Sequence, residues 1–395
     1  MGTLFAAVAL AVDVYDRTHS GLWVSALMVV EFVPTILIGL TLGPLVDRLS
    51  RRSLMIGSDL ARAAVFFALP FAPNAATIVA LAAVAGLATG FFKPAAGAGL
   101  PNLVPPEQLA QANGLLQTVE NLSWAVGPVI GGALTAADGP HLAYWINGAT
   151  FLVSAALVSG IAPRLLQSTT AVTRGHWRDL ADGLAAVATS RALLTVLVVW
   201  TIAQLGAGIV NVAEIFLARN SFHAGDFGYG LLFTAIGTGL VVGGVAAAPL
   251  EERLGVGKLY ALSLTTMGVG FLAAALSPNV WVASVFAAIG GVGNGGALVC
   301  NMVLVQRGAS DFVRGRAFTM IWSVNFVATG IGMFAAGVIV DQVGARWAWG
   351  AAGGVLVVAA VVAYVLTRGV VLLQPAEVRP ATDDEVARLS LERAG

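Results

Sequence analysis

The chain has 395 residues, of which 58% are hydrophobic and only 11% are charged, and its mean hydropathy is +0.86. Soluble domains are roughly 45–50% apolar and about 25% charged, so a soluble enzyme, a disordered chain and a coiled coil are excluded. Lys and Arg balance Asp and Glu at 21 each, so the charge indicates no nucleic-acid partner. The single cysteine, Cys300, and four scattered histidines provide no disulfide framework and no metal site. We therefore expect a polytopic membrane protein without a metal or cofactor.

Apolar runs of about 18–25 residues are each long enough to cross a hydrocarbon core of about 30 Å as a helix. A β-barrel is excluded because its strands would alternate over about ten residues. Residues 1–12 would form a further, incomplete span of about 18 Å. The other predicted spans are 21–43, 54–72, 76–100, 113–136, 143–162, 192–217, 227–250, 259–276, 279–305, 317–340 and 348–368.

The distribution of basic residues predicts the orientation of these spans. If the loop near 44–53 is cytoplasmic, 16 of the 21 Lys and Arg residues lie on that side. Only Arg17, Arg219 and Arg346 then lie outside. We therefore expect a multi-pass plasma-membrane protein with both termini in the cytoplasm.

The two halves of the sequence resemble each other at an offset of 205 residues. This shift pairs Pro73-Asn74 with Pro278-Asn279 and Gly139 with Gly344. Internal duplication is typical of secondary transporters, so an all-α protein of two six-helix bundles is predicted. The expected units are a bundle at 1–162, a cytoplasmic loop at 163–191, a bundle at 192–368 and a cytoplasmic tail at 369–395.

The same offset indicates that the first of the twelve spans is truncated. Met1 aligns with Gly206, although the seventh span begins near Ala192. The first half therefore lacks roughly fourteen residues of its first helix. We expect that the reading frame starts further upstream.

A loop signature stands between the second and third spans. Gly43 allows close helix approach, Asp47 can cap or bond a neighbouring helix end, and the basic residues can contact anionic headgroups. An ordinary basic hairpin is the alternative. The signature residues are Gly43, Asp47, Arg48, Arg51 and Arg52. The segment resembles the loop motif of the major facilitator superfamily, with Ser50 in place of a glycine.

The fifth span carries a second signature, a stripe of small residues with a proline that leaves a bare helix face. Generic small-residue packing is the alternative. The residues concerned are Gly114, Ser123, Gly127, Pro128, Gly131 and Gly132. They resemble the antiporter motif that exporters of the same superfamily carry, with Ser123 in place of a glycine. The stretches 91–94 and 103–113 are similar to the macrolide-efflux branch of the drug:proton antiporters, which also includes siderophore exporters.

Ionisable residues within spans are costly and indicate function. Glu31 lies near the middle of the second span, where a carboxyl can hold a proton. It is the first candidate for proton coupling, and the alternative is that it is a structural acid. Glu120 is the second candidate, and at the depth of Lys93 it could instead form a buried pair with that residue. Asp13 and Glu214 are expected at the membrane interface, and Asp59 and Arg62 are expected to pair within one helix.

The resemblance implies a proton-coupled exporter of drugs or other bulky compounds, working by alternating access as a monomer. The proton gradient would supply the energy, and the partners would be protons, a small-molecule substrate and the lipid bilayer. A nutrient or siderophore transporter of the same fold is the alternative, and a membrane-embedded enzyme is less favoured because clustered nucleophiles or ligands are missing. Candidates for the wall of the cavity are Phe32, Phe92, Trp124, Asn211, Trp322 and Asn325.

The loop signature leads to a first prediction. Asp47→Asn removes a charge from a loop that positions helices without building the fold, so we expect transport to be lost while membrane insertion is retained. Transport and membrane abundance should be measured together. Unchanged transport at equal abundance would argue against a role of Asp47 in gating.

Overall fold

The computed structural model describes residues 2–41, 49–105, 108–166, 187–188, 190–308 and 311–368. This part of the chain is helical apart from short connections and contains no strand. The first half contains α1 (Gly2–Thr18), α2 (Gly21–Thr41), α4 (Arg51–Ala68), α5 (Ala75–Gly99), α6 (Leu109–Asp138) and α7 (Pro140–Ser159). The second half contains α10 (Arg191–Phe216), α11 (Gly225–Leu254), α12 (Val256–Leu276), α13 (Val280–Gly308), α14 (Asp311–Val343) and α15 (Ala345–Thr367).

Short helical segments connect some of these helices. They are η1 (Leu69–Phe71), η2 (Leu100–Asn102), α8 (Pro163–Leu166) and the π-helix η4 (Leu217–Ser221). Within the described residues, nine helices are long and apolar enough to cross a membrane. The prediction of an all-α polytopic membrane protein is therefore confirmed. Most of the central loop and the whole tail from 369 onward lie outside the described residues.

The first helix is longer than its apolar sequence suggested. We expected a span that ends at residue 12, but α1 continues to Thr18 and is about 25 Å long at 1.5 Å per residue. Its charged residues are neutralised: Arg17 donates from Nε to Asp13 Oδ1 at 2.7 Å and from Nη1 to the Ala72 carbonyl at 2.8 Å. Paired charges one turn apart allow the helix to continue beyond its apolar part.

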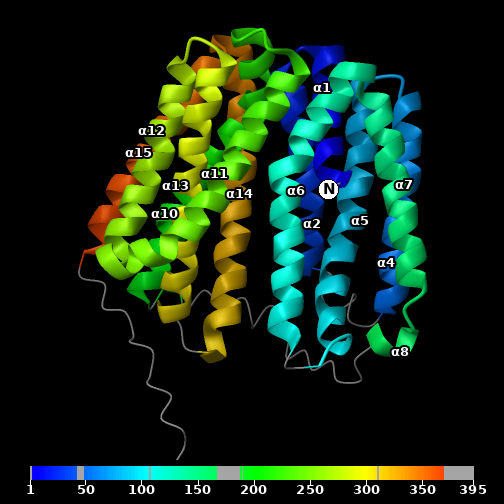
Figure 1. Ribbon diagram of the computed structural model, residues 1–395, viewed down its shortest axis with the longest axis horizontal. Coiled ribbons are helices and arrows are strands. Elements are labelled where there is room, and N and C mark those ends of the chain that lie inside the picture. The colour runs from blue at the N-terminus through cyan, green and yellow to red at the C-terminus, as the bar shows by residue number, and fades with distance from the viewer. Residues whose placement is uncertain are drawn as a thin grey trace, which may run out of the picture.

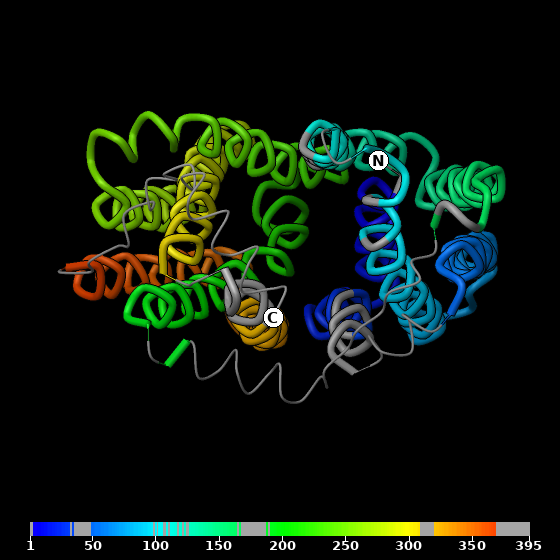
Figure 2. The backbone as a smooth tube through the Cα atoms, turned by 90° about the horizontal axis from the view of Figure 1, so that it is seen from below, coloured from blue at the N-terminus to red at the C-terminus, as the bar shows by residue number. Residues whose placement is uncertain are grey.

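The twelve long helices form two bundles that stand side by side (Figure 1). In the first bundle, α1 packs on α2, α6 and α7, while α4 packs on α5 and α7. In the second bundle, α13 packs on α11 and α12, and α10 packs on α14 and α15. Viewed from below, the helices of each half group together (Figure 2).

Equivalent positions of the repeat have equivalent structural roles. The Asn74 side chain accepts a hydrogen bond from the Thr77 amide at 2.9 Å at the start of α5, and Asn279 accepts one from the Val282 amide at 3.0 Å at the start of α13. Such caps satisfy amides that lack a partner within the helix. Gly139 and Gly344, which start α7 and α15, both have positive φ, at 73° and 95°. A left-handed backbone is accessible to glycine at little cost.

The predicted pair of Asp59 and Arg62 is confirmed on α4. Arg62 Nη2 lies 2.5 Å from Asp59 Oδ1, and the other carboxylate oxygen accepts a hydrogen bond from Ser154 of α7 at 2.7 Å. Both charged side chains are buried. The guanidinium also lies over the rings of Phe92 and Phe151, at 4.5 and 4.3 Å from their centres. The pair therefore joins α4 to α5 and α7 inside the first bundle.

The two bundles meet mainly through α2 with α14 and α6 with α11. Glycines allow the backbones to touch. A Cβ atom on Gly230 of α11 would lie 2.6 Å from the Pro128 carbonyl oxygen of α6, and one on Gly21 of α2 would lie 2.8 Å from the Gly337 carbonyl oxygen of α14. Ser25 of α2 donates to the Met333 carbonyl at 2.7 Å. Small residues promote such close approach of helices in membranes.

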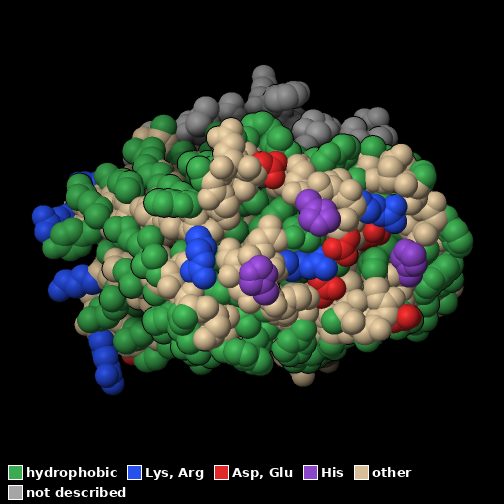
Figure 3. Space-filling view, turned by 90° about the horizontal axis from the view of Figure 1, so that it is seen from above, with side chains coloured by type: hydrophobic (Ala, Val, Ile, Leu, Met, Phe, Trp, Pro, Cys, Tyr) green, Lys and Arg blue, Asp and Glu red, His purple; other side chains and the backbone are tan. Residues whose placement is uncertain are grey.

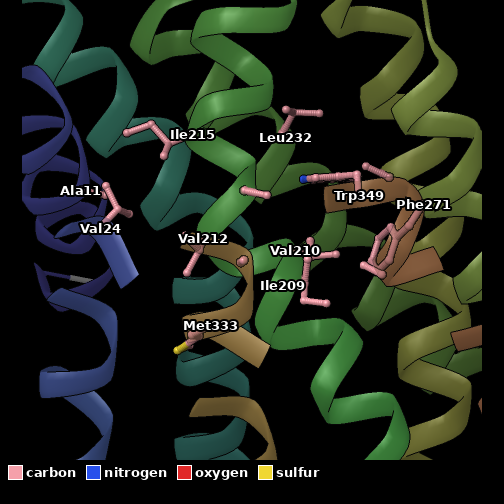
Figure 4. Packing of buried hydrophobic residues seen from close by; sticks show 14 of the residues in the cluster. Ala11, Val24, Ile209, Val210, Val212, Ile215, Leu232, Phe271, Met333 and Trp349 are labelled. Atoms are coloured by element: carbon pink, nitrogen blue, oxygen red, sulfur yellow. The ribbon is translucent and has the colours of Figure 1, made fainter. Parts of the chain in front are cut away.

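These contacts lie between the helix middles and one end of the molecule, which we call the closed end. Residues 15–25, 219–226 and 337–341 form this end, at the top of Figure 1. Below it, Met333 and Val212 of the second bundle face Ala11 and Val24 of the first (Figure 4). Farther from the closed end, α6 exposes Leu115, Leu116, Val119 and Leu122. The hydrogen bond and glycine contacts described above therefore join the bundles near the closed end.

The glycine contact between α6 and α11 generates a prediction. Gly230→Ala places a methyl group against the Pro128 carbonyl, so the bundles must separate there. Overpacking costs about 1–3 kcal/mol, which would open the closed end about 5- to 150-fold more often. The readout is maleimide labelling of Ser25→Cys in a Cys300→Ala background of the purified protein, because Ser25 is only 1% exposed in the closed interface.

Gly244→Ala is the matched control for this experiment. It adds the same methyl group to the same helix, where nothing lies within 4 Å of the added atom. We expect its labelling rate to equal that of the parent protein. Equal rates for Gly230→Ala and Gly244→Ala would show that the α6–α11 contact does not limit opening.

Candidate transport pathway between the bundles

At the closed end, a carboxylate from one bundle caps a helix of the other. Asp341, near the end of α14, accepts hydrogen bonds from the Gly21 amide at 2.6 Å, the Leu22 amide at 3.3 Å and the Ser20 hydroxyl at 3.0 Å. The first amides of a helix have no partners within it, and a negative charge there is favourable. The N-terminus of α2 is therefore completed only when the bundles are together at this end.

A second group of contacts crosses between the bundles nearby. Arg219 of η4 forms ion pairs with Asp16 of α1 and, at 3.0 Å, with Asp226 of α11. Tyr15 of α1 donates a hydrogen bond to Asn220, and the Arg219 guanidinium lies 4.7 Å from the centre of its ring. Charged and histidine side chains gather on this face of the molecule, which Figure 3 shows from above. The closed end thus combines a helix cap, ion pairs and an aromatic contact.

The antiporter-like signature of α6 lies in the interface between α6 and its neighbours. A Cβ atom on Gly131 would lie 2.6 Å from the Phe5 carbonyl oxygen of α1, and one on Gly132 would lie 2.6 Å from the Asp226 carbonyl oxygen of α11. Gly127 and Pro128 are buried, and Ser123 is buried with its hydroxyl donating to the Val119 carbonyl at 2.7 Å. Gly114 is exposed, with open space around it. The later part of the signature therefore sets the contact between the bundles.

Only part of the loop signature can be placed. Gly43, Asp47 and Arg48 lie outside the described residues. Arg51 donates to the Leu166 carbonyl of α8 at 3.2 Å, and Arg52 donates to the Ser159 carbonyl at the end of α7. Cations near a helix C-terminus interact favourably with its carbonyl groups. These two arginines therefore bind helix ends of their own bundle.

Three acids lie inside the protein near the middle and the closed end. Glu31 is half-buried, ten residues from either end of α2, and its backbone lies against Gly86 of α5. Asp13 and Glu214 were expected at the membrane interface, but their side chains are buried inside the protein. Asp13 is satisfied by Arg17 and by the Tyr144 hydroxyl at 3.0 Å, whereas Oε1 of Glu214 has no hydrogen-bond partner.

The acids Glu31 and Glu214 belong to different bundles, yet they have a common neighbour. Tyr229 of α11, which is fully buried, lies within electrostatic reach of both. Tyr144 of α7 lies within reach of Asp13 and Glu31. Tyr229 therefore lies near carboxyl groups of both bundles, and Tyr144 near two carboxyl groups of the first bundle.

The expected pair of Lys93 and Glu120 is not formed in this conformation. Both side chains are exposed, and the ion pairs among the described residues do not include them. Their equal depth along α5 and α6 did not bring them together, because these two helices do not pack directly on each other, whereas α1 packs on both. Glu120 lies on the exposed part of α6.

The cavity candidates separate into different environments. Phe92 packs against Arg62, and Asn211 is half-buried on α10. Asn325 is buried on α14, and Trp322 is half-buried beside Phe326, with 5.6 Å between ring centres. The side chains of Phe32 and Trp124 lie outside the described part of the structure. Trp322 and Asn325 both line a small pocket between α10, α13 and α14, within the second bundle.

Sequence reasoning missed the residues of the closed end. The sequence analysis singled out neither Asp16 nor Asp341. The repeat could have provided a signal, because Tyr15 and Asn220 are separated by the repeat offset of 205 residues. In a pair of bundles related by a two-fold axis, positions near the axis meet their own counterparts. A search for polar residues at that offset would have found this contact.

Comparison with known proteins agrees with the fold and the motifs. The transmembrane secretion effector family matches residues 1–377. Macrolide efflux protein A of Streptococcus pyogenes is 23% identical over 358 residues, covering 87% of this chain and 86% of the relative. Multidrug efflux pump Tap of Mycobacterium bovis is 26% identical over 356 residues, covering 84% and 82%.

Solved structures of transporters have the same fold. The nucleoside transporter NupG has a TM-score of 0.74 at 13% identity, covering 92% of this chain and 96% of that one. A bacterial homologue of the lysosomal transporter Spinster, solved in an inward-facing and unoccupied conformation, has a TM-score of 0.69 at 15% identity, covering 95% and 97%. The resemblance inferred from the motifs is confirmed, and the protein belongs to the transmembrane secretion effector family of major facilitator superfamily transporters.

Proposed function

We propose that the protein is a proton-coupled exporter of drugs or other bulky small molecules that works by alternating access. Two relatives that match most of the chain are efflux proteins. The late part of the α6 signature, which resembles an exporter motif, forms the contact between the bundles. The proposed partners are protons, an organic substrate and the plasma membrane, and the proposed working unit is the monomer.

The observation that carries this proposal is the contact between the bundles at the closed end. The closed end is held by a helix cap, exposed ion pairs and glycine contacts, all of which can separate without unfolding either bundle. Alternating access requires such a reversible contact on each side of a central site. The excess of positive charge at the opposite loops makes the closed end extracellular, with both termini cytoplasmic. The conformation in which this end is held together is then closed toward the outside.

Proton coupling is assigned to Glu31, and Glu214 becomes a further candidate. Glu31 lies at the middle of α2, where a carboxyl can face each side in turn as the bundles rock. Glu214 is 2% exposed and Oε1 has no partner, and burying an unpaired carboxylate is costly, so this site favours the neutral acid. Both acids lie within electrostatic reach of Tyr229 of α11. The exposed Glu120 has neither property.

A comparison of three glutamines tests this assignment. Glu31→Gln and Glu214→Gln mimic the protonated acid, so each should abolish concentrative efflux driven by a proton gradient, while counterflow without a gradient should continue. Glu120→Gln should retain both activities. The measurements are drug efflux in energised vesicles and exchange in de-energised ones, with the exposed Asp138→Asn as the control.

Different outcomes would contradict different parts of the proposal. If Glu31→Gln still concentrates substrate against its gradient, Glu31 is a structural acid. If Glu214→Gln loses counterflow as well as efflux, Glu214 supports the fold or substrate binding instead of proton movement. If the wild type does not concentrate any drug in energised vesicles, the proposed export itself is wrong.

The helix cap at the closed end gives a further prediction. Asp341→Ala removes the acceptor for the first amides of α2, and loss of an N-cap costs about 0.5–2 kcal/mol. The closed end should therefore open about 2- to 30-fold more often, seen as faster labelling of Ser25→Cys. Asp341→Asn keeps a good cap and should retain most of the closure. Similar labelling of both variants would show that Asp341 does not hold this end closed.

A further inference from the structure

A group of basic side chains lies at the outer edge of the second bundle, at the end opposite the closed end. Lys258 is in the first turn of α12, and Arg368 directly follows α15. These two helices pack on each other, and a Cβ atom on Gly257 would lie 2.9 Å from the Thr367 side chain. Figure 1 shows α12 and α15 at the margin of the molecule, far from the junction of the bundles. The two cations therefore stand on neighbouring helix ends away from the transport pathway.

The positive charges at this edge have no carboxylate partner among the described residues. Lys258, Arg368 and Arg191 of α10 are all exposed, and the described ion pairs include none of them. Arg191 donates from Nη2 to the Arg368 carbonyl at 3.2 Å, so it lies at the end of α15 as well. Three basic residues around one helix end create a positive local potential, which attracts an anionic partner.

Tyr364 of α15 holds the Arg368 guanidinium in place. Nη2 of Arg368 donates to the tyrosine hydroxyl at 2.6 Å, and the guanidinium carbon lies 4.2 Å from the centre of the ring. A guanidinium has five N–H donors, so several remain available for an anion. Lys258 lies within electrostatic reach of the same tyrosine. Tyrosines are frequent at the boundary between hydrocarbon and water, so the cations lie at the depth of lipid headgroups.

Next to these cations, both helices expose apolar side chains. On α12, Leu262 is 50% exposed and lies one turn from Lys258. On α15, Val361 and Val365 are 58% and 55% exposed and lie within two turns of Arg368. Residues three, four or seven positions apart share one side of a helix. The edge therefore combines a positive zone with an apolar zone, as the headgroup and acyl chains of an anionic phospholipid require.

We propose that this edge of α12 and α15 binds an anionic phospholipid. Lys258 and Arg368 contact the phosphate, and Leu262, Val361 and Val365 contact the acyl chains. Basic residues beside membrane-spanning helices attract anionic headgroups, and each strengthens binding about fivefold. With the closed end extracellular, this lipid lies in the cytoplasmic leaflet. The inference concerns the boundary with the bilayer and does not depend on which compound the protein transports.

A lipid suits this edge better than a soluble anion does. The three cations are exposed, so a soluble phosphate would gain only an attraction that water and salt weaken. The acyl chains of a phospholipid confine its phosphate to the depth of Lys258 and Arg368, which raises the effective concentration of the phosphate at the cations. The same cations therefore select strongly among lipids and weakly among solutes.

The test measures which lipids lie next to this edge in the purified full-length chain. Thr265→Cys in a Cys300→Ala background carries a bimane fluorophore, because Thr265 is exposed on α12 two turns from Lys258. Nanodiscs of phosphatidylcholine contain increasing fractions of brominated phosphatidylglycerol, which is anionic, or of brominated phosphatidylcholine. Bromine quenches the fluorophore only at close range, so the two quenching curves give the preference for the anionic lipid.

Five variants are compared in this background. Lys258→Gln and Arg368→Gln each remove one cation, whereas Lys258→Arg and Arg368→Lys keep the charge. Arg253→Gln is the matched control, because Arg253 is exposed in the last turn of α11, at the same end of the same bundle. It removes an equal charge from a helix that lies outside the proposed site.

We expect the parent protein to prefer phosphatidylglycerol roughly 20-fold, as for two basic residues at about fivefold each. Lys258→Gln and Arg368→Gln should each reduce this preference about fivefold, and 1 M salt should reduce it in the parent. Lys258→Arg and Arg368→Lys should retain it. Arg253→Gln should lower it less than about twofold, because salt screens a cation that does not contact the phosphate.

Four results would overturn the proposal. Equal quenching of the parent by both brominated lipids would exclude a preference for anionic lipid. An equal loss in Arg253→Gln and Lys258→Gln would show a general attraction to the charged end of the bundle. Displacement of brominated phosphatidylglycerol by soluble glycerophosphoglycerol would assign the cations to a free phosphodiester. A loss of preference in Lys258→Arg and Arg368→Lys as large as in the glutamine variants would show that the side chains act through packing and not through charge.

Discussion

The contact between the two bundles depends on backbone meeting backbone. Gly21, Gly132, Gly230 and Gly337 bring α2 against α14 and α6 against α11 so closely that a methyl group would touch a carbonyl or another main-chain atom. In a bilayer, helices gain little from hiding apolar side chains from each other, because lipid is equally apolar. Close packing of small residues is then the main attraction, and it is lost as soon as the backbones separate. The same glycines that join the bundles therefore also let them part cleanly.

Each polar contact at the closed end contributes only a small free energy. An exposed ion pair such as Arg219 with Asp16 contributes about 0–1 kcal/mol, and the cap that Asp341 provides for α2 contributes about 0.5–2 kcal/mol. Both Asp16 and Asp341 are exposed, so water can replace their partners when the end opens. A few small increments of this kind hold one conformation without trapping it. A buried pair such as Asp59 with Arg62, inside a single bundle, is by contrast kept away from the moving interface.

How much the sequence could predict follows from the range of each interaction. Helix positions and the pair of Asp59 with Arg62 depend on neighbours within a few residues, so pattern and spacing were sufficient. The cap at Gly21 could not be predicted, because its acceptor is 320 residues away in the other bundle. The length of α1 was underestimated because its last turn is charged. The pairing of Lys93 with Glu120 failed because equal depth on two helices does not specify which faces meet.

Glu214 shows most clearly where prediction from the sequence stops. Its position near a helix end suggested an acid at the membrane interface, whereas its burial depends on the packing of the whole junction. Asp13, by contrast, is held inside the first bundle by Arg17 and Tyr144. A proton on Glu31 or Glu214 and a bound compound need not touch each other to be coupled. Each ligand favours the conformation of the two bundles that it binds better, and the resulting linkage is reciprocal.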